Sequence, residues 1–203
     1  MRVYVYLHTN QSVLKMKESY TATPRLLYVA TQLFLKQGFA ATSVDQICRT
    51  TGVSKGAFFH YYRSKDEAAE AAIEYYWELL DEYLFFGLEL FEPKPKLERI
   101  RERMIELPEH LHFENGSLLG VLANEVEVSQ AGIREKLESV YDRWSGKLAE
   151  ALEATGYEAH FSKRLARQWI AVYEGAVAQA KAYNDKTIIR EQLELFAKLA
   201  YRQ

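Results

Sequence analysis

The sequence predicts an all-α fold, with a small three-helix domain followed by a larger helical domain. Apolar residues recur at helical spacing through nearly every segment of the 203-residue chain. Four prolines and ten glycines are too few for the many tight turns of a sandwich or barrel. With 48% hydrophobic and 27% charged residues, a chain of this length can bury a core without disulfides or metal ions.

The first expected helix covers residues 24–37. Apolar residues from Leu26 to Phe34 fall on one side of it. Pro24 suits the first turn, where its missing N–H has no acceptor in any case, and Gly38 can end the helix.

Two shorter helices should follow, each opened by a serine. Ser43 begins a capping box in which its hydroxyl accepts from the N–H three residues on and Gln46 reaches back. This helix should end at Gly52, and Ser54 should cap the next helix, over 55–61. A short helix, a glycine turn and a second short helix form the helix-turn-helix arrangement.

A long helix is expected from a second capping box at Ser64 toward Leu90. The segment 92–96, Glu-Pro-Lys-Pro-Lys, is expected to be a linker, because two prolines so close should not lie inside a helix. The next helix, over 97–107, should stop at Pro108.

The remaining periodic segments are also helical. The strongest periodicity precedes Gly156, and residues 112–117 are expected to be a loop. The short alternation at 3–6 is the one strand-like pattern. Four more helices are expected, over 118–128, 133–152, 161–183 and 187–202.

Charge is unevenly distributed along the chain. Residues 1–65 contain nine basic and two acidic residues, whereas the remainder contains seventeen basic and twenty-six acidic ones. A basic first third on an acidic body suggests that one end meets a polyanion. The alternative is a chance division of solvated surface charge.

Several classes of protein are excluded by what the sequence lacks. The single cysteine, Cys48, excludes a disulfide framework. No apolar stretch reaches eighteen residues and 1–15 do not resemble a signal peptide, so we expect a soluble, cytoplasmic protein. His110 and His112 lack a third ligand, so we expect no metal or cofactor. No catalytic motif is present, which argues against an enzyme.

Two runs resemble the N-terminal domain of TetR/AcrR-type transcriptional regulators: FLKQGFAATSVDQI, from Phe34 to Ile47, and GVSKGAFFHYYRSKDE, from Gly52 to Glu67. The resemblance extends over residues 24 to about 75. It implies that contacts to DNA phosphates or bases come from Ser43, Lys55, Gly56, Ala57, Phe59, His60, Tyr61 and Lys65.

The residue types on the second short helix suit this role. Gly56 and Ala57 let the backbone approach base edges, and Lys55 can reach phosphate or guanine. Two positions depart from the family pattern. Phe59 replaces the usual tyrosine, so a phenolic hydrogen bond to phosphate is missing. Cys48 replaces alanine, and we expect it to be a packed core residue rather than a redox sensor.

For the larger domain the resemblance implies dimerisation through the last two long helices and a pocket for a small molecule. Small residues on the penultimate helix, such as Gly175 and Ala178, would permit close packing across a dimer, although ordinary packing within one chain explains them as well. The pocket candidates are Trp77, Phe86, His110, Phe113, Asn124, Tyr141, Trp144, Trp169 and Tyr173. Each of them could equally be a core residue.

The run Gly116-Ser-Leu-Leu-Gly120 resembles a subgroup of these regulators. Some members carry a cysteine in this stretch and respond to electrophiles. This chain has Ser117 there, so reversible, non-covalent ligand binding is expected instead.

The expected organisation is an N-terminal extension over 1–23, the helix-turn-helix domain over 24–66 and the ligand-binding and dimerisation domain over 67–203. Residues 1–15 could be a basic arm, a disordered extension or the product of an upstream start codon. The expected function is that of a dimeric repressor released from a palindromic DNA operator by a small molecule. The alternative is a helical dimer that sequesters a ligand or docks a protein without specific DNA binding.

Overall fold

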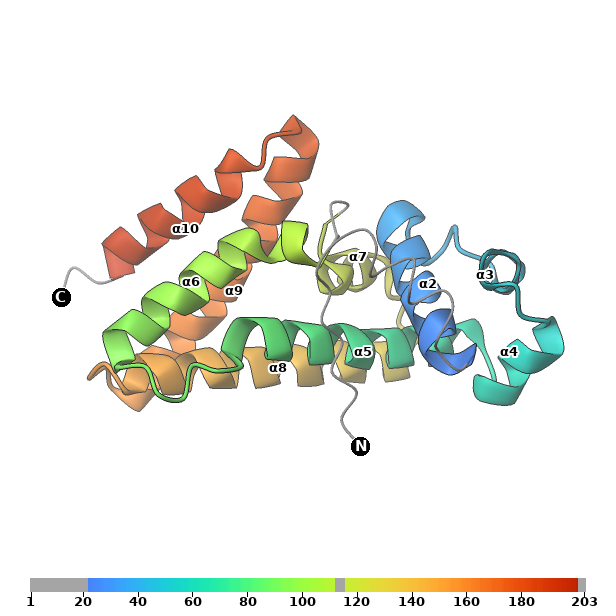
Figure 1. Ribbon diagram of the computed structural model, residues 1–203, viewed down its shortest axis with the longest axis horizontal. Coiled ribbons are helices and arrows are strands. Elements are labelled where there is room, and N and C mark those ends of the chain that lie inside the picture. Colours follow the sequence, from blue (N-terminus) through green and yellow to red (C-terminus); the bar gives the residue numbers. More distant parts are fainter. Residues whose placement is uncertain (1–21, 112–115, 201–203) are drawn as a thin grey trace.

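The computed structural model describes residues 22–111 and 116–200, and within these ranges the chain forms nine helices, α2 to α10, and no strand (Figure 1). The all-α fold predicted from the periodicity is therefore confirmed. The alternation at 3–6, the segment 1–15 and most of the expected loop at 112–117 lie outside the described residues.

Helices α2, α3 and α4 form a small domain at one end of the molecule (Figure 1). Its core comes from the predicted apolar stripe together with the inner sides of the two short helices. Phe34, Ile47 and Phe58 are fully buried, and Phe39 packs against Phe34 with 5.5 Å between the ring centroids. The three helices cover Ala22–Gln37, Val44–Thr51 and Lys55–Tyr61.

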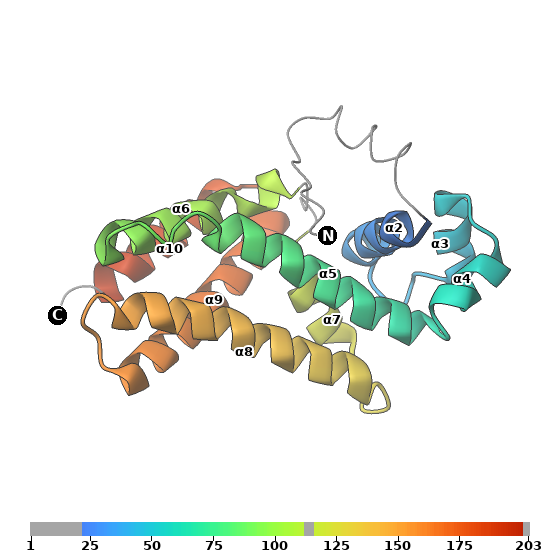
Figure 2. The ribbon, with the colours of Figure 1, turned by 60° about the horizontal axis from the view of Figure 1, so that its bottom comes forward.

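Helix α5, Lys65–Phe85, belongs to both domains. Its 21 residues span about 31 Å, starting beside α4 and running next to α8 (Figure 2). Ser64 caps it by accepting from the Glu67 N–H at 3.0 Å, as predicted. The expected domain boundary at 66/67 thus falls in its first turn. The helix ends before Leu90 because Gly87 adopts a left-handed conformation, with φ of 76°.

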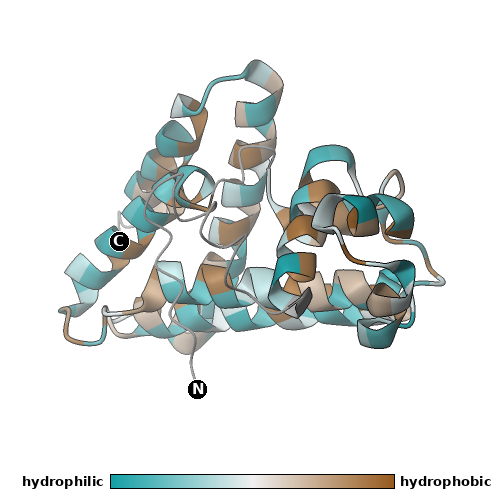
Figure 3. Ribbon diagram, turned by 45° about the vertical axis from the view of Figure 1, so that its right-hand side comes forward, coloured by the Kyte–Doolittle hydropathy of each residue, from teal (hydrophilic) through white to brown (hydrophobic). Residues whose placement is uncertain are grey.

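The larger domain is a bundle in which α8 packs on α5 and α9, and α10 packs on α9 and α6. Its helices are amphipathic, with hydrophilic and hydrophobic residues on each (Figure 3). No helix in the described ranges is both long and apolar enough to cross a membrane. The five helices after α5 cover Pro93–His110 (α6), Leu118–Glu125 (α7), Ala131–Glu153 (α8), Ala159–Tyr183 (α9) and Thr187–Ala200 (α10).

The prediction of a linker at 92–96 is wrong. Helix α6 begins at Pro93, so Pro93 and Pro95 lie in its first turn. The N–H groups of a first turn have no acceptor within the helix, and a proline there removes no hydrogen bond. The Lys96 N–H makes the first bond of the helix, to the Glu92 carbonyl at 2.9 Å.

Pro108 does not end α6 either. The helix includes it and continues to His110. The Leu111 N–H still bonds to the Leu107 carbonyl at 3.0 Å, because a proline lacks only its own N–H and leaves those of later residues free to bond.

Two ion pairs hold α5 against α8. The Arg143 guanidinium donates to both carboxylate oxygens of Glu74, at 2.7 and 2.8 Å, and lies over the ring of Trp77. The hydrogen bond from Arg143 lowers the pKa of Glu74. Lys147 pairs with Asp81 further along. The bidentate pair joins α5 and α8 with a defined geometry.

The predicted inner face of α8 is confirmed. One residue of the predicted stripe, Tyr141, is only half-buried, and the others are buried: Ile133, Leu137, Val140, Trp144, Leu148 and Leu152.

Candidate functional site

Local hydrogen bonds define the ends of α3 and α4. The Ser43 hydroxyl accepts from the Gln46 N–H at 3.2 Å, and the Ser54 hydroxyl accepts from the N–H three residues on at 3.1 Å. Gly52 ends α3 with φ of 74°, and its N–H donates to the Cys48 carbonyl at 2.8 Å. Both serine caps and the glycine turn are as predicted.

The second half of the capping box at Ser43 differs from the prediction. The Gln46 side chain does not reach back but forms two reciprocal hydrogen bonds with Gln37, at 2.8 and 2.9 Å. These bonds fasten α3 to the end of α2. The orientation of α3 therefore depends on a contact between helices as well as on its own cap.

The outer side of α4 is a solvent-facing surface. Phe59 is 51% exposed, whereas its neighbour Phe58 is fully buried beneath it. Ala57 is half-buried. The predicted DNA-contact residues that are exposed on α4 are Lys55, Gly56, Phe59, His60 and Tyr61.

Lys55, at the start of α4, forms an ion pair with Asp45 of α3. Its Nζ lies 2.6 Å from an Asp45 carboxylate oxygen, and both side chains are largely exposed. The hydrogen bond from Lys55 to Asp45 raises the pKa of Lys55, so the ammonium is fully charged near neutral pH. An exposed pair of this kind is weak, and a phosphate can replace the carboxylate.

Lys65 has a structural role in addition to its predicted one. Its Nζ donates to the Phe39 carbonyl at 2.8 Å and lies 4.0 Å from the centre of the Phe39 ring. The Ser43 hydroxyl is exposed and accepts from the Gln46 N–H as the cap of α3. It therefore lies at the helix N-terminus, where unpaired N–H groups favour an anion.

Cys48 is a core residue, as predicted. It is 6% exposed, and burial raises the pKa of its thiol. A buried thiol with a raised pKa carries little thiolate, the reactive form, at neutral pH.

Three of the predicted pocket residues gather between α8 and α9. Trp144 and Tyr173 are buried in edge-to-face contact, with 5.6 Å between the ring centroids. Tyr141 lies one turn before Trp144 on the same helix.

Three others are packed elsewhere. Trp169 is buried but contacts Phe196 of α10, with 6.0 Å between the ring centroids. Trp77 lies beneath the Arg143 guanidinium, whose carbon is 5.1 Å from the ring centroid. His110 stacks on Tyr83 at 3.8 Å. For each of these three residues, the packing contact accounts for an aromatic side chain at that position.

The last three do not join this cluster. Phe86 is 60% exposed at the end of α5. Asn124 is exposed on α7, where its amide donates to the Gly120 carbonyl at 2.8 Å. Phe113 lies outside the described residues.

Sequence reasoning missed a half-buried, inward-facing carboxyl group, that of Glu174, beside Tyr141 and Tyr173. The Ser117 hydroxyl, at the start of α7, donates to Glu174 Oε1 at 2.8 Å. Burial raises the pKa of Glu174 to about 7, against the opposing effect of the Ser117 hydrogen bond. Burial and the nearby Glu174 charge also raise the pKa of Tyr76, Tyr141 and Tyr173. We call Tyr76, Ser117, Tyr141, Tyr173 and Glu174 the carboxyl cluster.

The sequence did contain a signal for Glu174. Ile170 precedes it by four residues and Val177 follows it by three, and both are buried on α9. An acidic residue in phase with apolar ones indicates a buried charge. Its partner Ser117 lies 57 positions away, and no local pattern connects the two.

The carboxyl cluster adjoins a cavity of about 360 Å³. Helix α8 contributes Tyr141, Asp142 and Ser145 to its lining, and α9 contributes Arg167, Ile170, Ala171 and Glu174. Asp142 and Arg167 pair at 3.4 Å, so their charges largely cancel.

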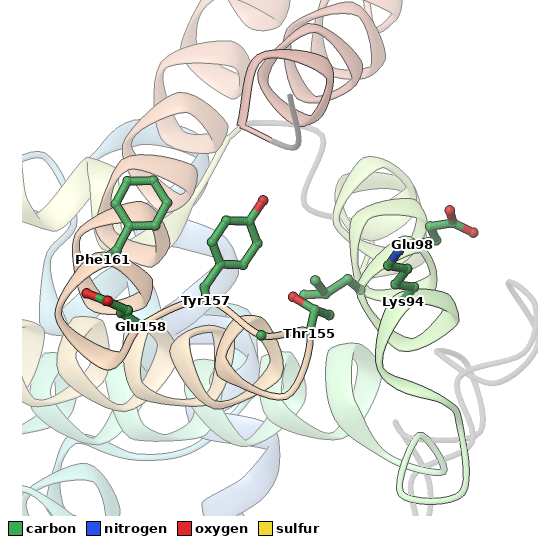
Figure 4. A pocket seen from close by; sticks show the side chains of 8 residues that line it. Lys94, Glu98, Thr155, Tyr157, Glu158 and Phe161 are labelled. Carbon is green, nitrogen blue, oxygen red and sulfur yellow. The ribbon is translucent and has the colours of Figure 1, made fainter. Parts of the chain in front are cut away.

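A larger cavity, of about 720 Å³, lies between the start of α6 and the turn from α8 to α9. Lys94 and Glu98 line one side and Tyr157 and Phe161 the other (Figure 4). None of the predicted pocket residues lines it. It lies at the end of the larger domain remote from α2, α3 and α4 (Figure 1), which makes it the less suitable site for controlling them.

Helix α7 connects the carboxyl cluster to the small domain. Ser117 caps its start, and Glu125 at its end accepts from the Ala40 N–H at 2.8 Å. Gly38, with φ of 87°, has no side chain, which leaves room for the Glu125 carboxylate. The eight residues of α7, about 12 Å long, thus connect Glu174 at one end with the loop before α3 at the other.

Two family models match the chain. The model described as bacterial regulatory proteins, tetR family, matches residues 26–72, which include α3 and α4. The model described as transcriptional regulator LmrA/YxaF-like, C-terminal domain, matches residues 93–194, half of the chain.

Similar proteins match across both domains. The transcriptional regulator AcuR of Cereibacter sphaeroides is 31% identical over 156 residues, covering 72% of this chain and 70% of that protein. The HTH-type transcriptional regulator YxaF of Bacillus subtilis is 23% identical over 179 residues, covering 86% and 94%. The crystal structure of a TetR transcriptional regulator from Legionella pneumophila has the same fold, with a TM-score of 0.78, 22% identity and coverage of 90% and 98%.

Proposed function

This chain belongs to the TetR family of transcriptional regulators, and from this premise we propose that it is a homodimeric repressor released from its operator by a small molecule. It is a DNA-binding regulator with a helix-turn-helix domain. The proposed setting is the cytoplasm, where the operator lies. The operator would be a near-palindrome, because a two-fold dimer presents two copies of α4 to successive major grooves.

The exposed side of α4 is the proposed reading surface. Lys55 would exchange Asp45 for a phosphate or a guanine, and His60 would contact base edges. Gly56 and Ala57 would permit close approach of the backbone. Phe59 and Tyr61 would pack against the sugar-phosphate backbone, while Ser43 and Lys65 would contact phosphates at the edges.

The proposed dimer uses α9 and α10. Small residues on the outer side of α9, among them Ala171, Gly175 and Ala178, are exposed. Leu195 and Leu199 on α10 are 52% and 62% exposed, one turn apart. Apolar side chains in this arrangement favour a helical interface, since their burial against a second copy removes them from water.

The observation that carries the release mechanism is the hydrogen bond from Ala40 to Glu125. Through this bond α7 contacts the small domain, and through Ser117 it contacts the carboxyl cluster. Helix α5 provides a second connection, because it starts at the small domain and is clamped to α8 by Arg143 and Glu74. A ligand that binds better to the state with displaced α5 and α7 would change the separation of the two α4 helices.

The test is selective recovery of DNA. Purified full-length protein is incubated with sheared DNA from the source organism, and the bound fragments are sequenced at two salt concentrations. Enrichment of one near-palindromic site is expected. Recovery without sequence preference at both concentrations would overturn the proposal and favour the sequestration alternative.

Variants locate the reading surface. Lys55→Ala and His60→Ala should each weaken binding to the recovered site by about tenfold or more. The matched control is Lys94→Ala, an exposed lysine at the start of α6 and outside the proposed dimer helices, and it should bind as the wild type does. Equal affinities of all four proteins would exclude α4 as the reading helix.

A further inference from the structure

Glu174 is a carboxyl group turned inward without a cationic partner. Its Oε1 accepts from Ser117, which is 6% exposed, and no basic side chain in the described part of the chain forms an ion pair with it. Burial is the main influence on its pKa, and no positive charge opposes it. A charge removed from water in this way is costly unless something compensates it.

The groups that face Glu174 come from four helices. They are Tyr76 on α5, Ser117 on α7, Tyr141 on α8 and Tyr173 on α9. All four are neutral hydroxyl groups at physiological pH. A serine hydroxyl does not ionise there, and the pKa of each tyrosine is raised further above its ordinary value. The protein therefore surrounds Glu174 with hydroxyl groups and aromatic rings. Arg167, the cationic side chain in the lining of the adjoining cavity, is paired with Asp142 rather than with Glu174.

The cavity of about 360 Å³ lies directly against this group, since Glu174 and Tyr141 both line it. Ile170 provides an apolar wall, and Ser145 a small polar one. At its mouth, the pairing of Asp142 with Arg167 leaves little net charge. The cavity is large enough for a compact organic molecule of one or two rings.

We propose that the effector of this regulator is a small organic cation, with its ammonium group against Glu174 and its apolar body in the cavity between α8 and α9. The inference rests on the proposed function and specifies the chemical class of the effector. A cation supplies the missing counter-charge. The face of the Tyr141 ring, which is electrostatically negative, also attracts a cation.

An anionic ligand would be repelled at this site. Its charge would lie beside the Glu174 carboxylate in a partly desolvated site, where like charges repel more strongly than in water. A neutral ligand of the same shape would gain the apolar contacts alone. The order of affinity expected from the charges is therefore cation, neutral molecule, anion.

Occupation of this site acts on α7. The hydroxyl that contacts Glu174 is also the cap of α7, where the Gly120 N–H donates to Ser117 Oγ at 3.4 Å. An ammonium group that draws Glu174 toward itself competes with Ser117. The other end of the same helix holds Ala40 in the small domain.

Three probes of similar size and different charge test the inference: 2-phenylethylamine, 2-phenylethanol and 3-phenylpropionate. Each is titrated calorimetrically into the full-length protein at pH 8. The amine should bind at least about tenfold more tightly than the alcohol, and the carboxylate more weakly than both. An alcohol or carboxylate that binds as tightly as the amine would overturn the inference.

The pH dependence gives an independent readout. The amine remains charged between pH 6 and 8, as alkylamines do. A change in its affinity with pH therefore reflects a change in the protonation of the protein. Because Glu174 takes up a proton near pH 7, affinity for the amine should fall about tenfold from pH 8 to pH 6. The alcohol should bind equally at both. An amine affinity that does not change with pH contradicts the proposed contact.

Variants separate this inference from the proposed function. Glu174→Gln keeps the shape and should bind the amine and the alcohol equally, whereas Glu150→Gln, an exposed position on α8, should retain the preference for the amine. Operator binding is measured on the same samples. Specific operator binding without any preference for the amine overturns the effector class alone, and failure of the wild type to bind any operator overturns the proposed function itself.

Discussion

The small domain and the carboxyl cluster are held by hydrogen bonds of different sequence range. In the small domain, Ser43 and Ser54 each bond to an N–H three residues on. In the larger domain, Ser117 reaches Glu174 across 57 positions, and Arg143 reaches Glu74 across 69. Local capping leaves the outer surface of α4 free to meet DNA. The long-range contacts instead bring polar groups toward the interior of the larger domain, where the proposed effector would meet them.

The two regions also differ in how exposed their charged groups are to water. The Lys55–Asp45 pair is exposed, so water and salt weaken it and a phosphate can replace the carboxylate. Glu174 is inward-facing, so its protonation depends on its surroundings. An exposed charge suits a surface that must bind and release a polyanion. A buried one suits a site that must distinguish one ligand from another.

The largest expected effect concerns the core of the small domain. Phe58→Ala should destabilise this domain by about 3–5 kcal/mol and abolish operator binding, because Phe58 is fully buried between the short helices. The adjacent Phe59→Ala should change stability by no more than about 0.5 kcal/mol, since Phe59 is half-exposed. Urea unfolding of both variants measures the difference, and equal destabilisation would contradict the assignment of the inner and outer sides of α4.

The second effect is a dependence of stability on pH. The pKa of Glu174 rises from 4.5 in the unfolded chain to about 7 in the folded one. Below pH 4.5 both states are protonated. As pH rises toward 7 the unfolded state loses its proton first, so the wild type loses stability relative to Glu174→Gln, by about 3 kcal/mol in total.

Chemical unfolding between pH 5 and 8 measures this loss. The control, Glu150→Gln, carries its change at an exposed position and should follow the wild type at each pH. A stability difference between wild type and Glu174→Gln that is constant from pH 5 to 8 would show that Glu174 titrates as an exposed carboxylate.

The third effect tests the connection between the regions. Glu125→Ala removes the acceptor for the Ala40 N–H and should cost about 1 kcal/mol. Hydrogen exchange at the Ala40 amide should become about fivefold faster, and the effector should release DNA less effectively. Glu127→Ala, an exposed position just beyond α7, is the matched control. Unchanged exchange at Ala40 in the Glu125 variant would remove α7 from the release mechanism.

The smallest effect concerns the exposed ion pair. Asp45→Asn should leave stability nearly unchanged, because both partners are largely exposed. Affinity for the operator should rise about two- to fivefold, since a negative charge beside α4 is removed and Lys55 is released. Fluorescence anisotropy with labelled DNA measures it, with Glu153→Gln at the far end of α8 as control. A lower affinity would mean that Asp45 positions Lys55 for DNA rather than competing with it.

Features that depend on neighbouring residues were predicted well from the sequence. The caps at Ser43, Ser54 and Ser64 and the left-handed turn at Gly52 are where the pattern placed them. The apolar stripe of α8 is buried. The rule that prolines end helices failed at Pro93, because it does not apply to a first turn.

Features that depend on distant residues were missed. Gln46 was expected to complete a cap and bonds to Gln37 instead. Of the predicted pocket residues, Phe86 is at the surface, because aromatic character alone does not tell which side of a helix end faces the core. Glu174 was overlooked, although its phase on α9 was a usable signal.

The sequence by itself therefore determined that the chain is helical, where the serine caps of α3, α4 and α5 lie, the helix-turn-helix arrangement and the resemblance to the family. All of these follow from residues within a few positions of one another, where backbone hydrogen bonding and helical periodicity apply. Only the tertiary structure decided which polar groups are buried together. The desolvation that raises the pKa of Glu174 exists only once the helices around it have packed, and the Ser117 hydroxyl that opposes this rise comes from a different helix.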